Sequence, residues 1–122
     1  VTLRKSYGGA HCVMSSKQLR GDFNYAWPTA EIAVMGAAGA IEVLEGRTIA
    51  KMENPDEKAQ FINEKTNEYK DKFANPYMAA SYGYIDDVIE PRNTRFRVIR
   101  AFQALQTKKL TNPLKKHSNI PL

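Results

Sequence analysis

Cysteine and long apolar runs are both scarce in this sequence of 122 residues. A single cysteine excludes an internal disulfide framework and a zinc site built of several cysteines, and it favours a reducing compartment. No stretch approaches the roughly 20 apolar residues that a membrane-spanning helix needs, so no membrane partner is expected. The sequence also has no phosphate-loop lysine, nucleophile elbow, zinc-type His/Glu spacing or dinucleotide-binding glycine fingerprint. No metal site and none of these motif-bearing enzyme classes is therefore predicted.

The charge is moderately unbalanced toward the basic side. There are 18 Lys and Arg residues against 13 Asp and Glu residues, a formal net charge of +5. The surplus is divided among residues 4–17, 92–100 and 108–116 instead of forming one stripe, and the aromatic residues do not alternate with it. This pattern is compatible with attraction to phosphate groups, but it does not predict a nucleic acid as partner.

Five of the seven glycines lie in the first 39 residues. Backbone conformations that need glycine are therefore expected in the first third of the chain, and the remainder looks helical. The chain begins at Val1 and runs directly into Gly8-Gly9 without an initiator Met or a leader segment. We therefore expect residues 1–122 to be part of a domain that starts inside a fold. Short apolar runs cannot be divided between buried strand and buried helix by period alone, and a mixed α/β layer is the prediction.

The predicted elements are short at the front and longer toward the back. Runs bounded by glycine or proline indicate a possible strand at 2–6, a strand-like segment at 23–27 and a strand at 84–89, while the apolar run at 31–35 is left open between strand and helix. Helices are predicted at 10–19, 37–44, 55–73, 76–82 and 94–107. The longest begins after Asn54, a good N-cap, with Pro55 at its first position. Its apolar stripe, formed by Ala59, Ile62, Tyr69 and Phe73, is narrow, so this helix should lie across the outside of a larger body. Residues 108–122 are expected to form an extended basic tail.

The most informative local pattern is Tyr7-Gly8-Gly9-Ala10 at the entrance to a helix. Two glycines permit a sharp turn with positive φ, and without a Cβ they let a ligand approach the backbone. The N–H groups of the first helical turn then point outward without partners and can bind a negatively charged oxygen. The alternative is a tight strand-to-helix turn that binds nothing.

The remaining candidate groups each have a plain structural interpretation. His11 and Cys12 are neighbours, but residues at i and i+1 on a helix do not face each other, so a packed thiol is favoured over a Cys–His nucleophile. Asp86 and Asp87 should point to opposite faces of a strand and cannot share a proton or a metal ion, so one is expected to cap or to form a salt bridge and the other to be solvated. Glu31 could orient a ligand or act as a first-turn helix residue.

Gly36 and Gly39 precede another helix-like run. They could form a second nest of N–H donors, or they could allow close packing of helix on strand. Spacing alone therefore indicates an α/β piece with backbone sites for oxyanions.

Six segments, taken together, resemble a known family. They are residues 4–10 (RKSYGGA), 13–17 (VMSSK), 24–36 (NYAWPTAEIAVMG), 72–76 (KFANP), 83–91 (GYIDDVIEP) and 115–122 (KKHSNIPL). In this order, and over essentially the whole chain, they resemble the beta subunits of biotin-dependent acyl-CoA carboxylases, the family of propionyl-CoA carboxylase beta and methylmalonyl-CoA carboxyltransferase. Family members are several times longer and consist of two crotonase-like (ClpP/crotonase) α/β halves. The resemblance implies that residues 1–122 are the C-terminal portion of the second, C-terminal carboxyltransferase domain.

The resemblance implies that the carboxyl group of carboxybiotin moves to the α-carbon of a short-chain acyl-CoA, most simply propionyl-CoA. Negative charge develops on the biotin ureido oxygen and on the thioester enolate, and aimed backbone N–H groups stabilise such charge by about 3–4 kcal/mol per donor in comparable sites. Carried onto this sequence, the hole that serves biotin falls on the N–H groups of Gly9 and Ala10. The substrate and biotin pocket would involve Tyr7, Gly8, His11, Cys12, Trp27, Pro28 and Glu31.

The resemblance also implies the partners. These are an acyl-CoA substrate, the remainder of the carboxyltransferase subunit, a biotin carboxylase and biotin carboxyl carrier subunit, and further copies in a hexamer built as a dimer of trimers. Biotin would be carried by the partner and not bound covalently here. The implied location is the cytoplasm, or the mitochondrial matrix in a eukaryote.

This chain differs from the family pattern at one informative position, and two alternatives to the leading function stay open. Relatives specific for propionyl-CoA often read Gly-Gly-Ala-Tyr-Asp where this chain has Gly8-Gly9-Ala10-His11-Cys12. The aspartate position lies by the pocket that selects acyl length, so an apolar Cys12 is expected to change that preference. The alternatives to a carboxylase component are a non-catalytic assembly element and the decarboxylase or transcarboxylase branch of the family.

Overall fold

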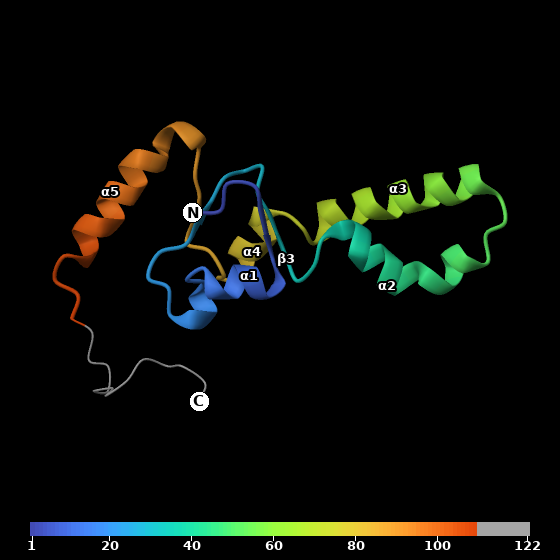
Figure 1. Cartoon of the computed structure of the whole chain (residues 1–122). Coiled ribbons are helices and arrows are strands. Elements are labelled where there is room, and N and C mark those ends of the chain that lie inside the picture. The colour runs from blue at the N-terminus through green and yellow to red at the C-terminus, as the bar shows by residue number, and fades with distance from the viewer. Residues whose placement is uncertain (110–122) are drawn as a thin grey trace, which may run out of the picture.

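The computed structural model describes residues 1–109, and this part of the chain mixes short strands with longer helices, as predicted (Figure 1). The elements in chain order are β1 (Lys5–Tyr7), α1 (Gly8–Val13), a 3₁₀ turn (Lys17–Leu19), β2 (Tyr25–Ala26), β3 (Glu31–Ala33), α2 (Ala37–Ala50), α3 (Pro55–Lys72), α4 (Pro76–Ser81), β4 (Asp87–Val88), a second 3₁₀ turn (Pro91–Asn93) and α5 (Thr94–Leu105). Most of the predicted tail 108–122 lies outside the described residues. No helix within residues 1–109 is long and apolar enough to cross a bilayer.

Two pairs of parallel strands lie at the centre of the body. β1 pairs with β3, with Tyr7 opposite Ala33, and β2 pairs with β4, with Tyr25 opposite Asp87. Parallel neighbours cannot be joined by a tight hairpin and need a crossover. The crossover from β1 to β3 includes α1, and the one from β2 to β4 includes α2, α3 and α4. The strand ends are therefore set by partners that are distant in sequence.

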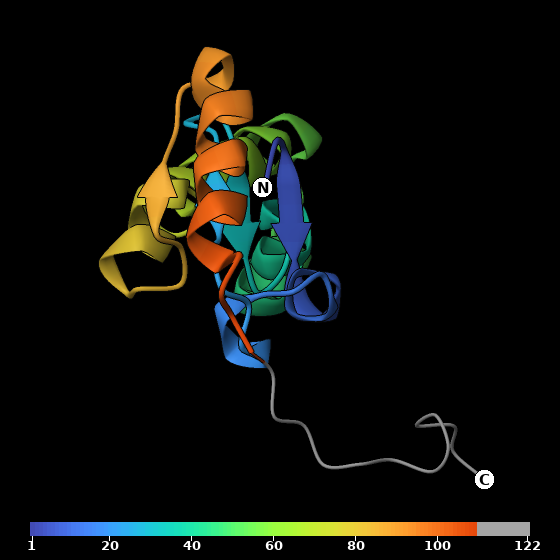
Figure 2. The ribbon, with the colours of Figure 1, turned by 90° about the vertical axis from the view of Figure 1, so that its left-hand side faces the viewer.

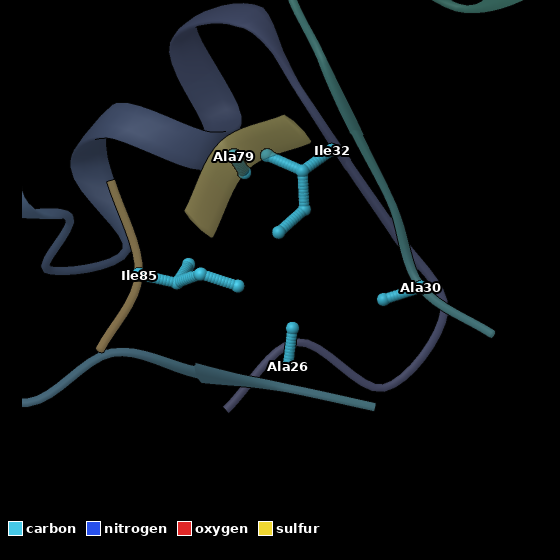
Figure 3. Packing of buried hydrophobic residues seen from close by; sticks show 5 residues of the cluster. All are labelled: Ala26, Ala30, Ile32, Ala79 and Ile85. Atoms are coloured by element: carbon cyan, nitrogen blue, oxygen red, sulfur yellow. The ribbon is translucent and has the colours of Figure 1, made fainter. Parts of the chain in front are cut away.

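A small apolar cluster holds these layers together. Figure 3 shows side chains from β2, β3, α4 and the adjoining loops pointing toward one another. Its members are Ala26, Ala30, Ile32, Ala79 and Ile85, all nearly inaccessible to solvent. Three of the five are alanines, so the backbones approach closely while each side chain buries little apolar area.

Helices α2 and α3 form a hairpin that extends away from the body as an arm (Figure 1). α3 begins as predicted: the Asn54 side chain accepts a hydrogen bond from the N–H of Asp56, and Pro55 occupies the first position. α2 buries Ala37, Ala40 and Ile41, whereas α3 has no buried residue. Within residues 1–109, the long helix therefore packs along α2 instead of lying across a larger body.

Helix α5 lies on the opposite side of the body from the arm, and Figure 2 shows it in front. The indole N–H of Trp27 donates to Oγ1 of Thr94 at 2.9 Å, which ties the start of α5 to the loop after β2. Arg97 forms an ion pair with Asp87 and lies over the ring of Tyr25, 5.4 Å from its centroid.

Several predicted boundaries are wrong for local physical reasons. The helix predicted at 10–19 begins earlier, ends at Val13 and resumes as a 3₁₀ turn, because Ser15 adopts φ 68° and interrupts it. The strands predicted at 23–27 and 84–89 shrink to two residues each, because only these residues pair with a neighbouring strand. The helix predicted at 37–44 continues to Ala50, past Gly46, because α3 packs along it.

Candidate active site at the first strand-to-helix turn

The turn from β1 to α1 is built around a glycine that no other residue can easily replace. Gly8 has φ +52°, in the left-handed region that strains residues carrying a Cβ. A Cβ at Gly8 would also lie 2.9 Å from the carbonyl oxygen of Val34, which follows β3. The close approach of these two backbones explains why a glycine stands at this position.

The next two residues present backbone donors at the surface. Gly9 and Ala10 are exposed and lie in the first turn of α1, where N–H groups have no partner within the helix. No atom from outside the helix lies within 4 Å of the place where a Cβ of Gly9 would be, so this side of Gly9 faces open space. The turn can therefore accept an anionic oxygen near the positive end of the helix.

Tyr7 and Glu31 join the two strands beside this turn. The Tyr7 hydroxyl donates a hydrogen bond to Oε2 of Glu31. Desolvation by burial, this hydrogen bond and the negative charge of Glu31 together raise the pKa of Tyr7 to about 12. Tyr7 is thus a neutral hydroxyl throughout the physiological range. Glu31 lies in β3, so the interpretation of it as a first-turn helix residue is wrong.

His11 and Cys12 both face the same cavity but do not pair with each other. Nδ1 of His11 lies 2.8 Å from Oγ of Ser6 on β1, which ties α1 to the strand before it. Cys12 is a free thiol of intermediate burial. This geometry offers a packed wall residue, and among residues 1–109 the Cys12 thiol has no hydrogen bond to a base.

A largely apolar cavity of about 700 Å³ lies between the turn and the arm. Gly8, His11 and Cys12 form its wall on the turn side. Leu44 from α2 with Tyr69 and Phe73 from α3 form its wall on the arm side. Sequence reasoning missed the arm residues as pocket residues, although Tyr69 and Phe73 belong to the apolar stripe predicted for the long helix.

Four of the predicted pocket residues do not line this cavity: Tyr7, Trp27, Pro28 and Glu31. The indole of Trp27 is bonded to Thr94 on the opposite side of the body. Pro28 and Glu31 line a separate, shallower depression of about 450 Å³ next to Lys70 and Tyr77. Sequence proximity in the 27–31 segment therefore does not bring these side chains to the cavity beside Cys12.

The two adjacent aspartates are used separately, and both form ion pairs. Asp86 pairs with Lys17 at 2.7 Å and accepts the backbone N–H of Asn24 at 2.6 Å, while Asp87 pairs with Arg97. Desolvation opposes ionisation of Asp86, but the Lys17 hydrogen bond, the Asn24 N–H and the Lys17 charge together lower the pKa of Asp86. The expectation that one of the two would be free in solvent is wrong. Among residues 1–109, no group of three acidic, His or Cys side chains is arranged to hold a metal ion.

The sequence was compared with known protein families and proteins. The family model for the carboxyl transferase domain matches residues 1–120 of this chain. The propionyl-CoA carboxylase beta chain of Cereibacter sphaeroides is 57% identical over 122 residues, which are all of this chain and 22% of that protein. The mitochondrial propionyl-CoA carboxylase beta chain of Homo sapiens is 52% identical over the same length, 21% of that protein.

A solved structure of transcarboxylase 12S, described as a hexamer with methylmalonyl-coenzyme A and methylmalonic acid bound, has a similar fold. It matches with a TM-score of 0.83 and 45% identity, covering 98% of this chain and 22% of that chain. The chain thus spans about a fifth of the length of the proteins to which it is similar.

Proposed function

This chain belongs to the carboxyl transferase domain family, and from that premise we propose that it forms part of the carboxyltransferase active site of a biotin-dependent acyl-CoA carboxylase. The proposed reaction moves the carboxyl group from carboxybiotin to the α-carbon of a short-chain acyl-CoA, with propionyl-CoA as the first candidate. The names of the related carboxylase chains support this substrate. The observation that carries the proposal is the open β1–α1 turn with its exposed N–H groups at Gly9 and Ala10.

The role proposed for this turn is electrostatic. When the carboxyl group leaves, negative charge remains on the ureido oxygen of biotin, and the N–H groups of Gly9 and Ala10 stabilise it without having to reorient. The adjoining cavity offers apolar surface to both reactants. Tyr69 and Phe73 suit the fused rings and alkyl chain of biotin, and Cys12 is proposed to face the acyl chain of the thioester. Tyr7, Trp27, Pro28 and Glu31 are not proposed as ligand contacts, because they do not line that cavity.

The rest of the machinery is proposed by similarity. The β1–α1 arrangement belongs, in this proposal, to a crotonase-like second half, with residues 1–122 as its C-terminal portion. Biotin arrives on a carrier protein after carboxylation by a biotin carboxylase, and the subunits assemble as a hexamer, as the related transcarboxylase does. The compartment is the cytoplasm, or mitochondria in a eukaryote, where the human relative is located by name.

Replacing Gly9 in the full-length subunit tests the proposed hole. Gly9→Pro removes one N–H donor at a helical position where the φ of proline fits, and we expect kcat to fall by about 10²–10³-fold. Gly9→Ala is the matched variant, because it keeps the N–H and its Cβ meets nothing within 4 Å, so its loss should be far smaller. Turnover would be measured together with the hexamer mass. Equal activity of Gly9→Pro and wild type would contradict the proposed role.

A second function, assembly without catalysis, is favoured by one observation. Helix α5 buries no residue, and Phe96 and Phe102 are 58% and 69% exposed. An apolar face of this kind is suited to an interface with other parts of the complex. The same Gly9→Pro variant separates the two functions, because loss of assembly with no separate effect on turnover would support the structural role.

A further inference from the structure

Three contacts fix the turn that joins β1 to α1. The Tyr7 hydroxyl is bound by Glu31 on the neighbouring strand. The Tyr7 ring packs on Gly36, where a Cβ would come within 3.3 Å of the ring. Gly8 lies so close to the carbonyl oxygen of Val34 that a Cβ at this position would come within 2.9 Å of that oxygen. Because Tyr7 is also the N-cap of α1, its position sets the direction of the first helical N–H groups.

A tyrosine is an unusual residue at an N-cap. Ser, Thr, Asp and Asn are preferred there because their short side chains accept a hydrogen bond from the second or third helical N–H. In α1 these positions are Gly9 and Ala10. The Tyr7 side chain makes no capping hydrogen bond, and its hydroxyl is engaged by Glu31. Both donors therefore stay available for an external acceptor.

The two side chains come from opposite strands of one parallel pair. Tyr7 is opposite Ala33, and Glu31 lies two residues before Ala33, so Tyr7 and Glu31 share one face of the sheet. Neither lines the cavity beside Cys12. Their hydrogen bond thus lies outside the cavity, where it can fix the position of the β1–α1 backbone without contacting a ligand in that cavity.

We propose that Tyr7 and Glu31 are a positioning pair, whose hydrogen bond holds the N–H groups of Gly9 and Ala10 unbonded and aimed at the oxyanion. This role deepens the proposed carboxyl transfer and rests on it. Positioning contributes strongly to rate. When a substitution far from the reacting atoms misplaces a group by about 1 Å, turnover can fall about 100-fold. The pair would act on kcat, since it touches neither the acyl-CoA nor biotin.

The test uses Tyr7→Phe in the full-length subunit, with transfer from methylmalonyl-CoA to free biotin as the assay. In this reaction the bond from the α-carbon to the carboxylate breaks and a bond from that carboxylate to N1 of biotin forms. The proton from N1 goes to the α-carbon, so propionyl-CoA and carboxybiotin are the products. Tyr7→Phe keeps the ring on Gly36 and removes only the hydroxyl. We expect kcat to fall about tenfold or more, with KM for methylmalonyl-CoA changed less than about twofold.

Two further variants separate positioning from other roles. Glu31→Gln keeps an acceptor oxygen and should retain part of the activity. The double variant should be no slower than Tyr7→Phe alone, because both substitutions remove one shared interaction. Tyr77→Phe, which removes a hydroxyl from an exposed tyrosine in α4, is the matched control and should keep wild-type kcat. Thermal unfolding of each variant shows whether the fold is retained.

A solvent deuterium isotope effect on kcat distinguishes positioning from acid catalysis. If Tyr7 donated a proton in the rate-limiting step, the wild type would show an isotope effect that Tyr7→Phe loses, whereas a positioning hydroxyl should leave the isotope effect unchanged. If Tyr7→Phe keeps the wild-type kcat, or if the losses of the two single variants multiply in the double variant, the positioning role is wrong while carboxyl transfer stands. If the wild-type subunit itself transfers no carboxyl group to biotin, the proposed function fails first.

Discussion

At the scale of single residues, the site depends more on backbone than on side-chain chemistry. Gly8 permits the turn, Gly9 and Ala10 present donors, and Cys12 forms part of the cavity wall. A cysteine side chain behaves as a small apolar group at such a wall, whereas an unpaired carboxylate there is costly to desolvate. The residue at position 12 should therefore influence which acyl chains are accepted more than it influences the chemistry.

Cys12→Asp tests that influence. We expect the variant of the full-length subunit to lower the rate with butyryl-CoA relative to propionyl-CoA, because a longer apolar chain would approach a charged wall. The rates with acetyl-, propionyl- and butyryl-CoA would be compared at saturating biotin. Cys12→Ser is the matched control, since it adds polarity without charge and should shift the ratio less. Unchanged ratios in Cys12→Asp would mean that residue 12 does not contact the acyl chain.

Residue-level prediction from the sequence succeeded where the signal was local. The Gly8-Gly9-Ala10 turn was identified from adjacent glycines before a helix, and the structure has that turn. Trp27 was expected at the pocket but bonds Thr94, which is 67 residues away. The Tyr7–Glu31 bond depends on the register of two strands, and no local pattern encodes that register.

At the scale of elements, the same distinction between local and distant signals decides which boundaries were predicted. α3 was predicted nearly to the residue, because Asn54 and Pro55 are start signals that act within one turn. β2 and β4 were predicted too long, since their ends are set by each other across about 60 residues of sequence. The arm was not foreseen, because pairing of α2 with α3 is a tertiary contact.

The cap of α3 gives a prediction for the arm. Asn54→Ala removes the acceptor for the N–H of Asp56, and we expect the first turn to lose about 1 kcal/mol of local stability. Hydrogen exchange of a peptide covering residues 54–60, in the full-length subunit, would show faster exchange by several-fold. Asn54→Asp keeps a capping oxygen and should exchange at close to the wild-type rate. Equal protection in Asn54→Ala would show that packing against α2 alone fixes this helix start.

The ion pair at the β2–β4 edge gives a pH-dependent prediction. Because folding lowers the pKa of Asp86, its stabilising contribution is present above the unfolded pKa of about 3.9 and is lost as pH falls through the lower folded value. Asp86→Asn should therefore open the strand pair more easily at pH 7, by about 1 kcal/mol, and the difference from wild type should shrink below about pH 4. Hydrogen exchange of peptides covering β4 measures this opening.

The partner substitution completes this test. Lys17→Met removes the cation at 2.7 Å and should reproduce most of the effect of Asp86→Asn at pH 7. If the Asp86→Asn effect persists unchanged at pH 3, the stabilisation comes from packing or from the Asn24 contact and not from the ionised pair.

At the scale of the whole molecule, the described residues bury few large apolar side chains and leave many of them exposed. The buried apolar set contains six alanines, two of them in α2, and its isoleucines are spread over separate elements. Val34, Val43 and Phe102 are each more than two-thirds exposed. Burial of large side chains is the main source of folding stability, and alanines supply little of it. We propose that these faces are covered in a subunit of the relatives' length, of which this chain spans about a fifth.

The last prediction concerns the 122-residue chain produced alone. We expect it to bind an apolar dye such as ANS and to associate at micromolar concentration. Amide exchange in β4 and α5 should be fast, because neither element contains a buried residue. The same segments in the full-length subunit are the control and should exchange slowly, since the apolar face at Phe96 and Phe102 would be covered there. A cooperative unfolding transition of the isolated chain, with exchange as slow as in the full-length subunit, would contradict this. The sparse core would then be sufficient, and the exposed face of α5 would have to be explained by a partner outside the subunit.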